Sequence, residues 1–244
     1  DANFDGTNMI YTIENTTITA NQSFEDVSLF VDGNGSNNNV YLSSNGVTIK
    51  AVYGAVVGDT GELNSITYTI VDLSTLNSKI SNGEDVTKVC TTPITDMSNL
   101  FQYNSTFNQD ISTWDVSNVT DMNSMFAGNL ITPTQFNQPL NNWNVGSVTD
   151  MNRMFDNNIA FNQPIDNWDV SNVDDMSNLF NGNTSFNQDI SSWDVSNVTY
   201  MSSMFGYCND FNQPIGSWNV SNVTDMYAMF FASSFNQNIS NWGV

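Results

Sequence analysis

Residues 107–126 read Phe-Asn-Gln-Asp-Ile-Ser-Thr-Trp-Asp-Val-Ser-Asn-Val-Thr-Asp-Met-Asn-Ser-Met-Phe, and the chain repeats this sequence with small changes. The near-copies begin at Phe136, Phe161, Phe186, Phe211 and Phe235. Each copy has one tryptophan, and successive tryptophans are 29, 25, 25, 25 and 24 residues apart (Trp114, Trp143, Trp168, Trp193, Trp218 and Trp242). A fixed period of this length predicts a solenoid, in which every repeat forms one coil and stacks on its neighbours.

The spacing of apolar residues within a coil predicts its local structure. Trp114 and Val116 alternate with polar residues, as in a short strand, whereas Met122, Met125 and Phe126 have the spacing of a short helical or 3₁₀ turn. A threonine and an aspartate precede that turn in most copies, and both suit a helix N-terminus. We therefore expect each coil to run strand, corner, helical turn, loop. The side chains expected in the core are Phe107, Ile111, Trp114, Val116, Val119, Met122, Met125 and Phe126.

The repeat Phe-Asn-Gln-x-Ile-x-x-Trp-Asp/Asn-Val-x-x-Val-Thr-Asp-Met-x-x-Met-Phe resembles that of the BspA-type leucine-rich-repeat proteins of bacterial surfaces, particularly their branch with 25-residue repeats. The resemblance covers about residues 84–244. It implies a right-handed, leucine-rich-repeat-like solenoid with a parallel sheet on one face, and a surface or adhesive role. That family has no agreed catalytic residues, so the resemblance says more about the fold than about an activity.

Residues 1–72 lack the repeat and predict a small β domain or a set of strands in front of the solenoid. Asn45-Gly46, between two apolar runs, is a strong hairpin signal. The fold class expected for the whole chain is therefore a mainly β repeat solenoid preceded by a small all-β region. The predicted strands are Met9–Ile13, Thr17–Thr19, Val27–Val31, Val40–Leu42, Val47–Val52 and Ile66–Val71.

Residues 73–244 form the predicted solenoid. A capping helix is expected over 73–83, with Ser74 as its N-cap and Gly83 just past its end. Residues 84–106 predict a degenerate coil, and 107–244 predict six coils, the last one incomplete. No cap follows Trp242, so we expect either that the natural protein continues or that something else covers this end, through end-to-end contacts or a larger chain.

The net charge of −21, with only four basic residues, argues against binding to nucleic acid or to an anionic membrane. No apolar run is long enough to span a membrane, and the chain, which begins at Asp1 without a signal peptide, resembles a mature or trimmed product. The chain contains no histidine, which removes the commonest general base. We expect a protein that is not an enzyme.

No cofactor is expected, and calcium is the alternative considered. Asp1, Asn3 and Asp5 resemble the first half of a calcium-binding loop, although Thr12 stands where the loop needs glutamate and a solvated turn is the competing interpretation. Asp169 and Asp194 are adjacent in a column of Asp and Asn residues on the expected outer face of the sheet, which needs no metal. Cys90 and Cys208 are expected to lie too far apart for a disulfide.

The asparagine of each Phe-Asn-Gln is expected to satisfy backbone groups of adjacent coils at a tight corner. The segments between Met-Phe and the next Phe-Asn-Gln vary, and such loops often form the binding face of a repeat protein. The residues predicted to contact a partner are Tyr103, Leu130, Ile131, Tyr207 and Phe231.

The function expected is that of a secreted or cell-surface binding and adhesion module, which recognises another protein or a glycan at a cell surface. The alternative is a structural spacer or filament segment of a larger surface protein.

Overall fold

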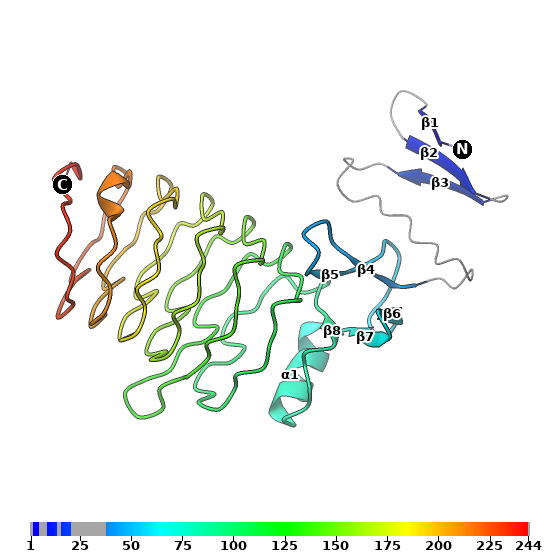
Figure 1. Ribbon diagram of the computed structural model, residues 1–244, viewed down its shortest axis with the longest axis horizontal. Coiled ribbons are helices and arrows are strands. Elements are labelled where there is room, and N and C mark those ends of the chain that lie inside the picture. Colours follow the sequence, from blue (N-terminus) through cyan, green and yellow to red (C-terminus); the bar gives the residue numbers. More distant parts are fainter. Residues whose placement is uncertain (1, 5–8, 14–15, 21–37, 244) are drawn as a thin grey trace. The chain divides into compact units, whose positions relative to one another are not determined.

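A computed structural model of the 244-residue chain describes residues 2–4, 9–13, 16–20 and 38–243 (Figure 1). The chain divides into two compact units, residues 1–38 and 39–244. In the first unit, strands β1 (Ala2–Phe4), β2 (Met9–Ile13) and β3 (Thr16–Ala20) pair antiparallel in the order β1-β2-β3. Two of the predicted strands are thereby confirmed. The strand predicted at Val27–Val31 lies outside the described residues.

The second unit begins with a β-hairpin, β4 (Val40–Leu42) and β5 (Ile49–Ala51), which pair antiparallel. The hairpin predicted at Asn45-Gly46 is confirmed, since Gly46 has a φ of 72° and Asn45 Oδ1 accepts bonds from the backbone N–H groups of Val47 and Thr48. A side-chain oxygen thus satisfies two turn donors that the strands leave unpaired.

A second hairpin joins β6 (Thr60–Leu63) to β7 (Ile66–Ile70), and β7 pairs in parallel with β8 (Val89–Cys90). Strand β6 was not predicted, because the residues around Gly58–Gly61 are typical of a turn. The turn itself lies at Asn64 and Ser65, whose φ angles of 54° and 63° are those of a two-residue hairpin turn without glycine. Val40, Ile49, Tyr68, Ile70 and Cys90 form one buried cluster, so residues 39–72 pack with the repeats and the compact unit begins at Asn39, not at residue 73.

The helix α1 (Leu73–Ser81) caps the apolar start of the repeats, as expected. Its buried Leu76, together with the half-buried Leu73 and Ile80, belongs to the core cluster of the coils. The N-cap is Asp72 and not the predicted Ser74, because Asp72 Oδ1 accepts a 2.8 Å bond from the N–H of Thr75. Aspartate and serine are equally good caps, and only the backbone angles at residue 72 distinguish them.

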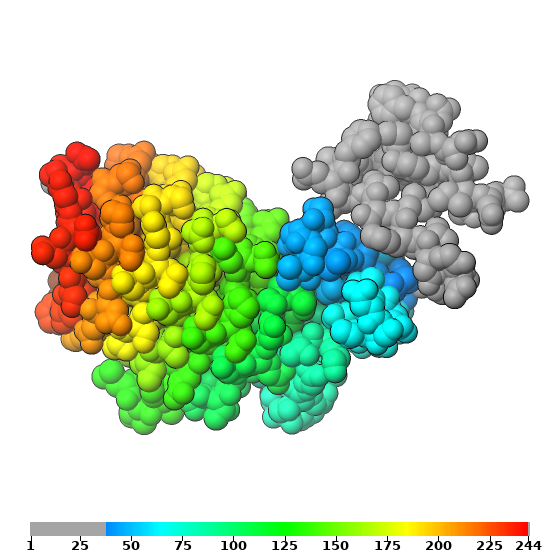
Figure 2. Space-filling view, in the orientation of Figure 1, coloured from blue at the N-terminus to red at the C-terminus, as the bar shows by residue number. Residues whose placement is uncertain are grey.

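From residue 84 onward the chain winds through coils that lie side by side, seen as successive bands from green to red in Figure 2. Adjacent coils are joined along one strip of backbone, which comprises residues 96–103 in the first coil and the equivalent residues in the later ones. The N–H groups of Met97, Asn99, Phe101 and Tyr103 donate to the carbonyls of Asp121, Asn123, Met125 and Ala127, over 2.7–3.0 Å. This pattern recurs between later coils. Isolated parallel bridges mark the same strip at Asp96, Asp121, Asp150, Asp175, Tyr200 and Asp225.

The local structure of a coil differs from the strand and helical turn that the periodicity predicted. Among the described residues, the stretch around Trp114–Val116 forms no strand, and 122–126 forms tight turns in which Met125 N–H donates to the carbonyl of Met122. Ser124, the third residue of that turn, has a φ of 56°. A left-handed residue at this position breaks a helix and allows alternate N–H groups to face the next coil. One short 3₁₀ helix occurs elsewhere, at Ile215–Ser217.

The side chains predicted for the core are buried. Within each coil two phenylalanine rings stack, with centroids 4.0 Å apart for Phe155 and Phe161. Between coils the same rings stack again, as in Phe155 and Phe180 at 5.7 Å. Two continuous columns of rings therefore run along the stack. Rows of methionine and valine fill the space beside them, from Val116, Met122 and Met125 in the first full coil to Val195, Met201 and Met204 in a later one.

The tryptophan of every repeat also makes one hydrogen bond to the preceding coil. Trp168 Nε1 donates to the carbonyl of Leu140 at 3.0 Å, and the five other indoles make the corresponding bond over 3.0–3.3 Å. Because a buried indole N–H without an acceptor is costly, this bond fixes how far each coil is rotated relative to the one before it.

The invariant asparagine also joins adjacent coils. Asn137 Oδ1 accepts from the backbone N–H of Asn162 at 3.0 Å and from the Gln163 amide at 3.1 Å. Asn108, Asn162, Asn187 and Asn212 cap the N–H of the next asparagine likewise. The structural role predicted for this column is confirmed.

We predict that Trp168→Ala lowers the free energy of unfolding by about 3–5 kcal/mol, as for other buried aromatic truncations. The change removes the 6.4 Å stack on Trp193 and the indole bond to the carbonyl of Leu140, which then keeps only the backbone N–H of Trp143. Urea unfolding followed by tryptophan fluorescence measures it. Trp168→Phe, which restores most of the volume, should cost clearly less, and equal effects of the two changes would contradict a core role for the ring.

We also predict that Ser203→Val destabilises the fold by roughly 1–2 kcal/mol more than Ser202→Val. Both serines are half-buried neighbours, but only Ser203 has a positive φ, of 52°. A β-branched residue is strained there. Urea midpoints of the two variants give the comparison, and two equal midpoints would show that the turn relaxes without cost.

Candidate binding surface

The five residues predicted to contact a partner are all exposed. The exposed fractions are 93% for Leu130 and 90% for Ile131, and they are between 50% and 58% for Tyr103, Tyr207 and Phe231. Leu130 and Ile131 bury almost none of their surface in the fold, and the three aromatic residues leave at least half of theirs exposed. Burial in the core therefore does not account for these side chains.

The loop that carries Leu130 and Ile131 is held in place by its own polar residues. Asn129 Oδ1 accepts 2.8 Å bonds from the N–H groups of Ile131 and Thr132. The buried hydroxyl of Thr134 donates to the carbonyl of Phe126 at 2.6 Å. Thr134 also forms a parallel bridge with Asn158 in the next coil. The insert is therefore a loop whose backbone is held by hydrogen bonds and which presents two apolar side chains at its tip.

A second exposed group gathers on the strips 200–207 and 225–231 of the last two coils, and sequence reasoning found only half of it. Tyr207 and Phe231 pack edge to face with ring centroids 5.4 Å apart. Tyr200 and Tyr227, exposed by 44% and 79%, lie on the same two strips, which are joined by the bond from Ser203 N–H to the carbonyl of Tyr227. We refer to Tyr200, Tyr207, Tyr227 and Phe231 as the aromatic patch.

The signal that could have revealed the whole patch is a comparison of equivalent positions. Tyr200 stands in the column that is aspartate in every other coil, and Tyr227 stands where the others have serine or asparagine. Gly206 lies at the position of Phe231 in the preceding coil. A Cβ added at Gly206 would lie 2.7 Å from Asn181 Oδ1, so this surface is tight beneath the patch.

The structure does not bring the predicted contact residues into one site. Tyr103 and Tyr207 occupy the same column four coils apart, with Gly128, Asn157 and Gly182 between them. At a rung spacing of about 4.8 Å the two tyrosines are roughly 20 Å apart. Leu130 and Ile131 lie near the Tyr103 end, and Phe231 lies at the other. The chain thus offers two separate apolar surfaces.

Of the residues considered for calcium, Asp169 and Asp194 accept hydrogen bonds within turns, and the others lie at the N-terminus of the chain. Asp169 Oδ1 accepts bonds from the N–H and hydroxyl of Ser171, and Asp194 Oδ1 accepts from the N–H of Ser196. Asp1 and Asp5 lie outside the described residues, and Asn3 is described only as part of β1. Among the described residues, no three acidic or cysteine side chains group in a way that could hold a metal ion.

Asp115, which begins that outer column, is buried by the β4–β5 hairpin. Its carboxylate accepts a 2.7 Å bond from Thr92 Oγ1 and lies 3.8 Å from the Lys50 ammonium. The expected outer face is therefore covered at its first rung and open at Asp169 and Asp194. Both cysteines are free, as predicted, and both are buried. Burial raises the pKa of the Cys208 thiol, which makes it a poor nucleophile.

Three carboxylates of the coils have pKa values shifted from the usual value, with different causes. Burial raises the pKa of Asp156, against the opposing effect of hydrogen bonds from Asn181 and Asn157. Burial also raises the pKa of Asp150, and the negative charges of the neighbouring Asp121 and Asp175 raise it further. Hydrogen bonds from Ser191 lower the pKa of the exposed Asp189.

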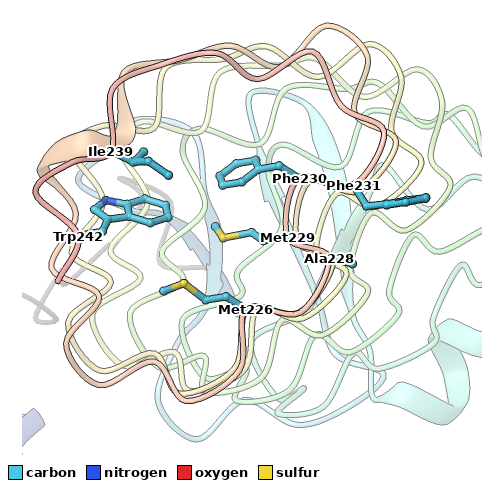
Figure 3. A pocket seen from close by; sticks show the side chains of 7 residues that line it. All are labelled: Met226, Ala228, Met229, Phe230, Phe231, Ile239 and Trp242. Atoms are coloured by element: carbon cyan, nitrogen blue, oxygen red, sulfur yellow. The ribbon is translucent and has the colours of Figure 1, made fainter. Parts of the chain in front are cut away.

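The C-terminal end of the stack is a shallow apolar hollow (Figure 3). Met226, Met229, Phe230, Ile239 and Trp242 point into the ring of the last coil, and Phe231 points away from it. Phe231 is therefore shared between the rim of this hollow and the aromatic patch. At the opposite end, a more polar groove of about 610 Å³ lies between the end of α1 and the first full coil, lined by residues that include Glu84, Asn104 and Gln109.

Within the described part of the chain, no helix has the length and apolar character needed to cross a membrane. A family model described as "Mycoplasma protein of unknown function, DUF285" matches residues 71–174 and 160–244. The two matches together cover the whole repeat region. Comparisons with curated proteins and with solved structures gave no match.

We predict opposite pH dependences for two charge-removing variants. Because the folded-state pKa of Asp156 is raised, its ionisation opposes folding at neutral pH, so Asp156→Asn should be more stable than the parent near pH 7.5, and the gain should shrink as the pH falls toward about 4. Asp189, with its lowered pKa, stabilises the fold at neutral pH, so Asp189→Asn should lose stability there and approach the parent in acid. Urea midpoints across this pH range test both. A less stable Asp156→Asn at neutral pH would contradict the assignment.

Proposed function

Because this chain belongs to the family described as Mycoplasma protein of unknown function, DUF285, we propose that it is a bacterial surface protein that binds another protein or a glycan and carries out no catalysis. Its stacked coils would form a repeat solenoid related to the BspA-type leucine-rich-repeat proteins. The repeat motif and the joined strips of backbone support that relation.

The aromatic patch is the observation that carries this proposal. Tyrosine and phenylalanine are enriched at protein–protein interfaces and bury large areas at little cost in side-chain entropy. The coils from 107 to 182 have small or polar residues at the four patch positions, so coil packing does not require rings there. Leu130 and Ile131 add a second apolar contact, on a loop whose backbone is already ordered.

The charge of the chain supports a particular kind of partner. The net charge of −21 repels anionic surfaces and favours partners that are neutral or cationic. Lys50, Lys79 and Lys88 are engaged in ion pairs in the N-terminal part of the repeat unit. The sequence of the last two coils contains no basic residue, so a partner approaching the patch meets no positive side chain there.

We predict that Tyr200→Ser with Tyr227→Ser weakens binding to intact cells at least about tenfold, since aromatic anchors often contribute 2 kcal/mol or more each. Binding of the labelled protein is measured by flow cytometry over a concentration series. Treatment of the cells with protease or with glycosidases distinguishes a protein partner from a glycan.

The matched control is Asp169→Asn with Asp194→Asn, because Asn144 and Asn219 already occupy the same column and an amide oxygen preserves the turn bonds. The control should bind like the parent. Loss of binding in the control, together with parent-like binding of the tyrosine variant, would move the site to the outer face. Leu130→Ser with Ile131→Ser tests the second surface separately.

The second candidate function is that of a structural spacer in a larger surface assembly. The open hollow at the end of the stack favours it, since an exposed apolar end is suited to contact with another element. A spacer would show binding at this end and none at the aromatic patch.

A further inference from the structure

The last coil has a row of backbone donors without acceptors. In the preceding coil, the N–H groups of Met201, Ser203, Phe205 and Tyr207 donate to the carbonyls of Asp225, Tyr227, Met229 and Phe231 over 2.8–2.9 Å. The equivalent donors in the last coil find no acceptor within residues 38–243; they are the N–H groups of Met226, Ala228, Phe230 and Ala232. Four unpaired donors at alternate residues form an edge ready to pair with another backbone.

Two acceptors on the same end lack the inter-coil donor that their equivalents have in the preceding coil. The carbonyl of Ile215 accepts the indole N–H of Trp242, and Asn212 Oδ1 accepts the N–H of Asn236. The equivalent atoms one coil later are the carbonyl of Ile239 and Asn236 Oδ1. The carbonyl of Ile215 also accepts the backbone N–H of Trp218, and the carbonyl of Ile239 likewise accepts that of Trp242 at 3.0 Å. In the described part of the chain, no indole reaches the carbonyl of Ile239 and no donor reaches Asn236 Oδ1.

The apolar residues of this end are incompletely buried. Phe205, Phe211 and Ile215 are fully buried in the preceding coil, whereas their equivalents in the last coil, Phe230, Phe235 and Ile239, are only half-buried. Val223 and Met226 are half-buried in the same way. The side chains around the hollow point inward and have no layer above them (Figure 3).

We propose that this end face, formed by residues 221–242, is a docking surface for one further coil of the same repeat. Its donors, acceptors and apolar hollow match, position by position, what each coil supplies to the next one. Five such interfaces already exist between the tryptophan-bearing coils of this chain, and the end face continues that series. The inference does not depend on binding at the aromatic patch.

The direction of the hydrogen bonds disfavours a second copy of the chain in this place. Along the strip, the N–H groups that join coils face the C-terminal end, and the carbonyls that accept them belong to the following coil. Two end faces brought together would set donors against donors. A head-to-tail contact would meet α1, whose Leu76 is buried in the core at the other end of the stack.

A capping helix is also a poorer occupant than a coil. An amphipathic helix like α1 could cover the hollow, but its carbonyl groups are used inside the helix and cannot accept four bonds from one edge. Residues 196–219, by contrast, already present the carbonyls of Tyr200, Ser202, Met204 and Gly206 to the preceding coil. They also place Gly206 at the position of Phe231, where a bulky side chain would crowd the ring.

The test appends a copy of residues 196–219 after Val244, since Trp242, Gly243 and Val244 align with Trp218, Asn219 and Val220. Amide hydrogen exchange of the full chain, with and without the added coil, is measured at Met226, Ala228, Phe230 and Ala232. We expect exchange at these four amides to slow by about 100-fold or more with the added coil, because they then exchange only by unfolding. The control is the same addition with the copies of Phe205, Phe211 and Trp218 replaced by serine.

The control should leave the four amides as fast as in the parent. Unchanged exchange with the intact added coil would overturn the proposal. Equal slowing by the serine control would also overturn it, because the protection would then not come from coil packing. A parent whose four amides become protected as its concentration rises would show instead that a second copy covers the face. None of these outcomes bears on the tyrosine variants, so this test and that of the binding function fail independently.

Discussion

The bond between each indole N–H and the carbonyl of the preceding coil is the constraint on which the stack depends. It places a large ring inside the coil and allows only one rotation between neighbours, because a shifted ring would leave a buried donor unpaired. Trp143 reaches Ile111 across 32 residues, while Trp168 reaches Leu140 across 28. The four extra residues lie in the loop around Leu130, outside the ring of packed side chains. Insertions are therefore accommodated where they do not alter the indole bond, and such loops are free to diverge.

Much of the packing could be predicted from the sequence, because a buried column must be apolar in every coil. The tryptophan, phenylalanine and methionine columns and the Asn45-Gly46 hairpin followed from spacing alone. The conformation of the strip did not. Asn99, Ser124 and Arg153 have positive φ angles, but they are not glycine and share no side-chain type that would predict this conformation. The bonds between the joined strips hold the backbone there. The same i, i+3, i+4 spacing fits a helical turn and a chain of tight turns, and only the bonds between coils decide between them.

Two of the four residues of the aromatic patch could be predicted from the sequence, and the conformation of the strip explains why the other two could not. Tyr207 and Phe231 fall in segments that vary in length and sequence, which marked them as exposed. Tyr200 and Tyr227 fall in a segment that a helical interpretation treats as the start of a capped turn, where a side chain's direction is not evident. The bonds between coils instead join this segment to its neighbour along the whole strip. Tyr200 and Tyr227 are thereby exposed on the same two strips as the contacting rings of Tyr207 and Phe231.

Phe231 links this surface to the end of the stack, because its ring contacts Tyr207 and its side chain borders the hollow. In the preceding coil the equivalent residue is glycine, and an added Cβ there would approach Asn181 Oδ1 to 2.7 Å. Phe231 thus has a residue without a side chain beside it in the preceding coil. A coil docked on the end face must present a small residue at this position if Phe231 is to keep its place in the patch. A coil with a large residue there would satisfy the backbone donors and still displace the ring from Tyr207. The sequence of the docked coil would then determine whether the aromatic patch stays intact.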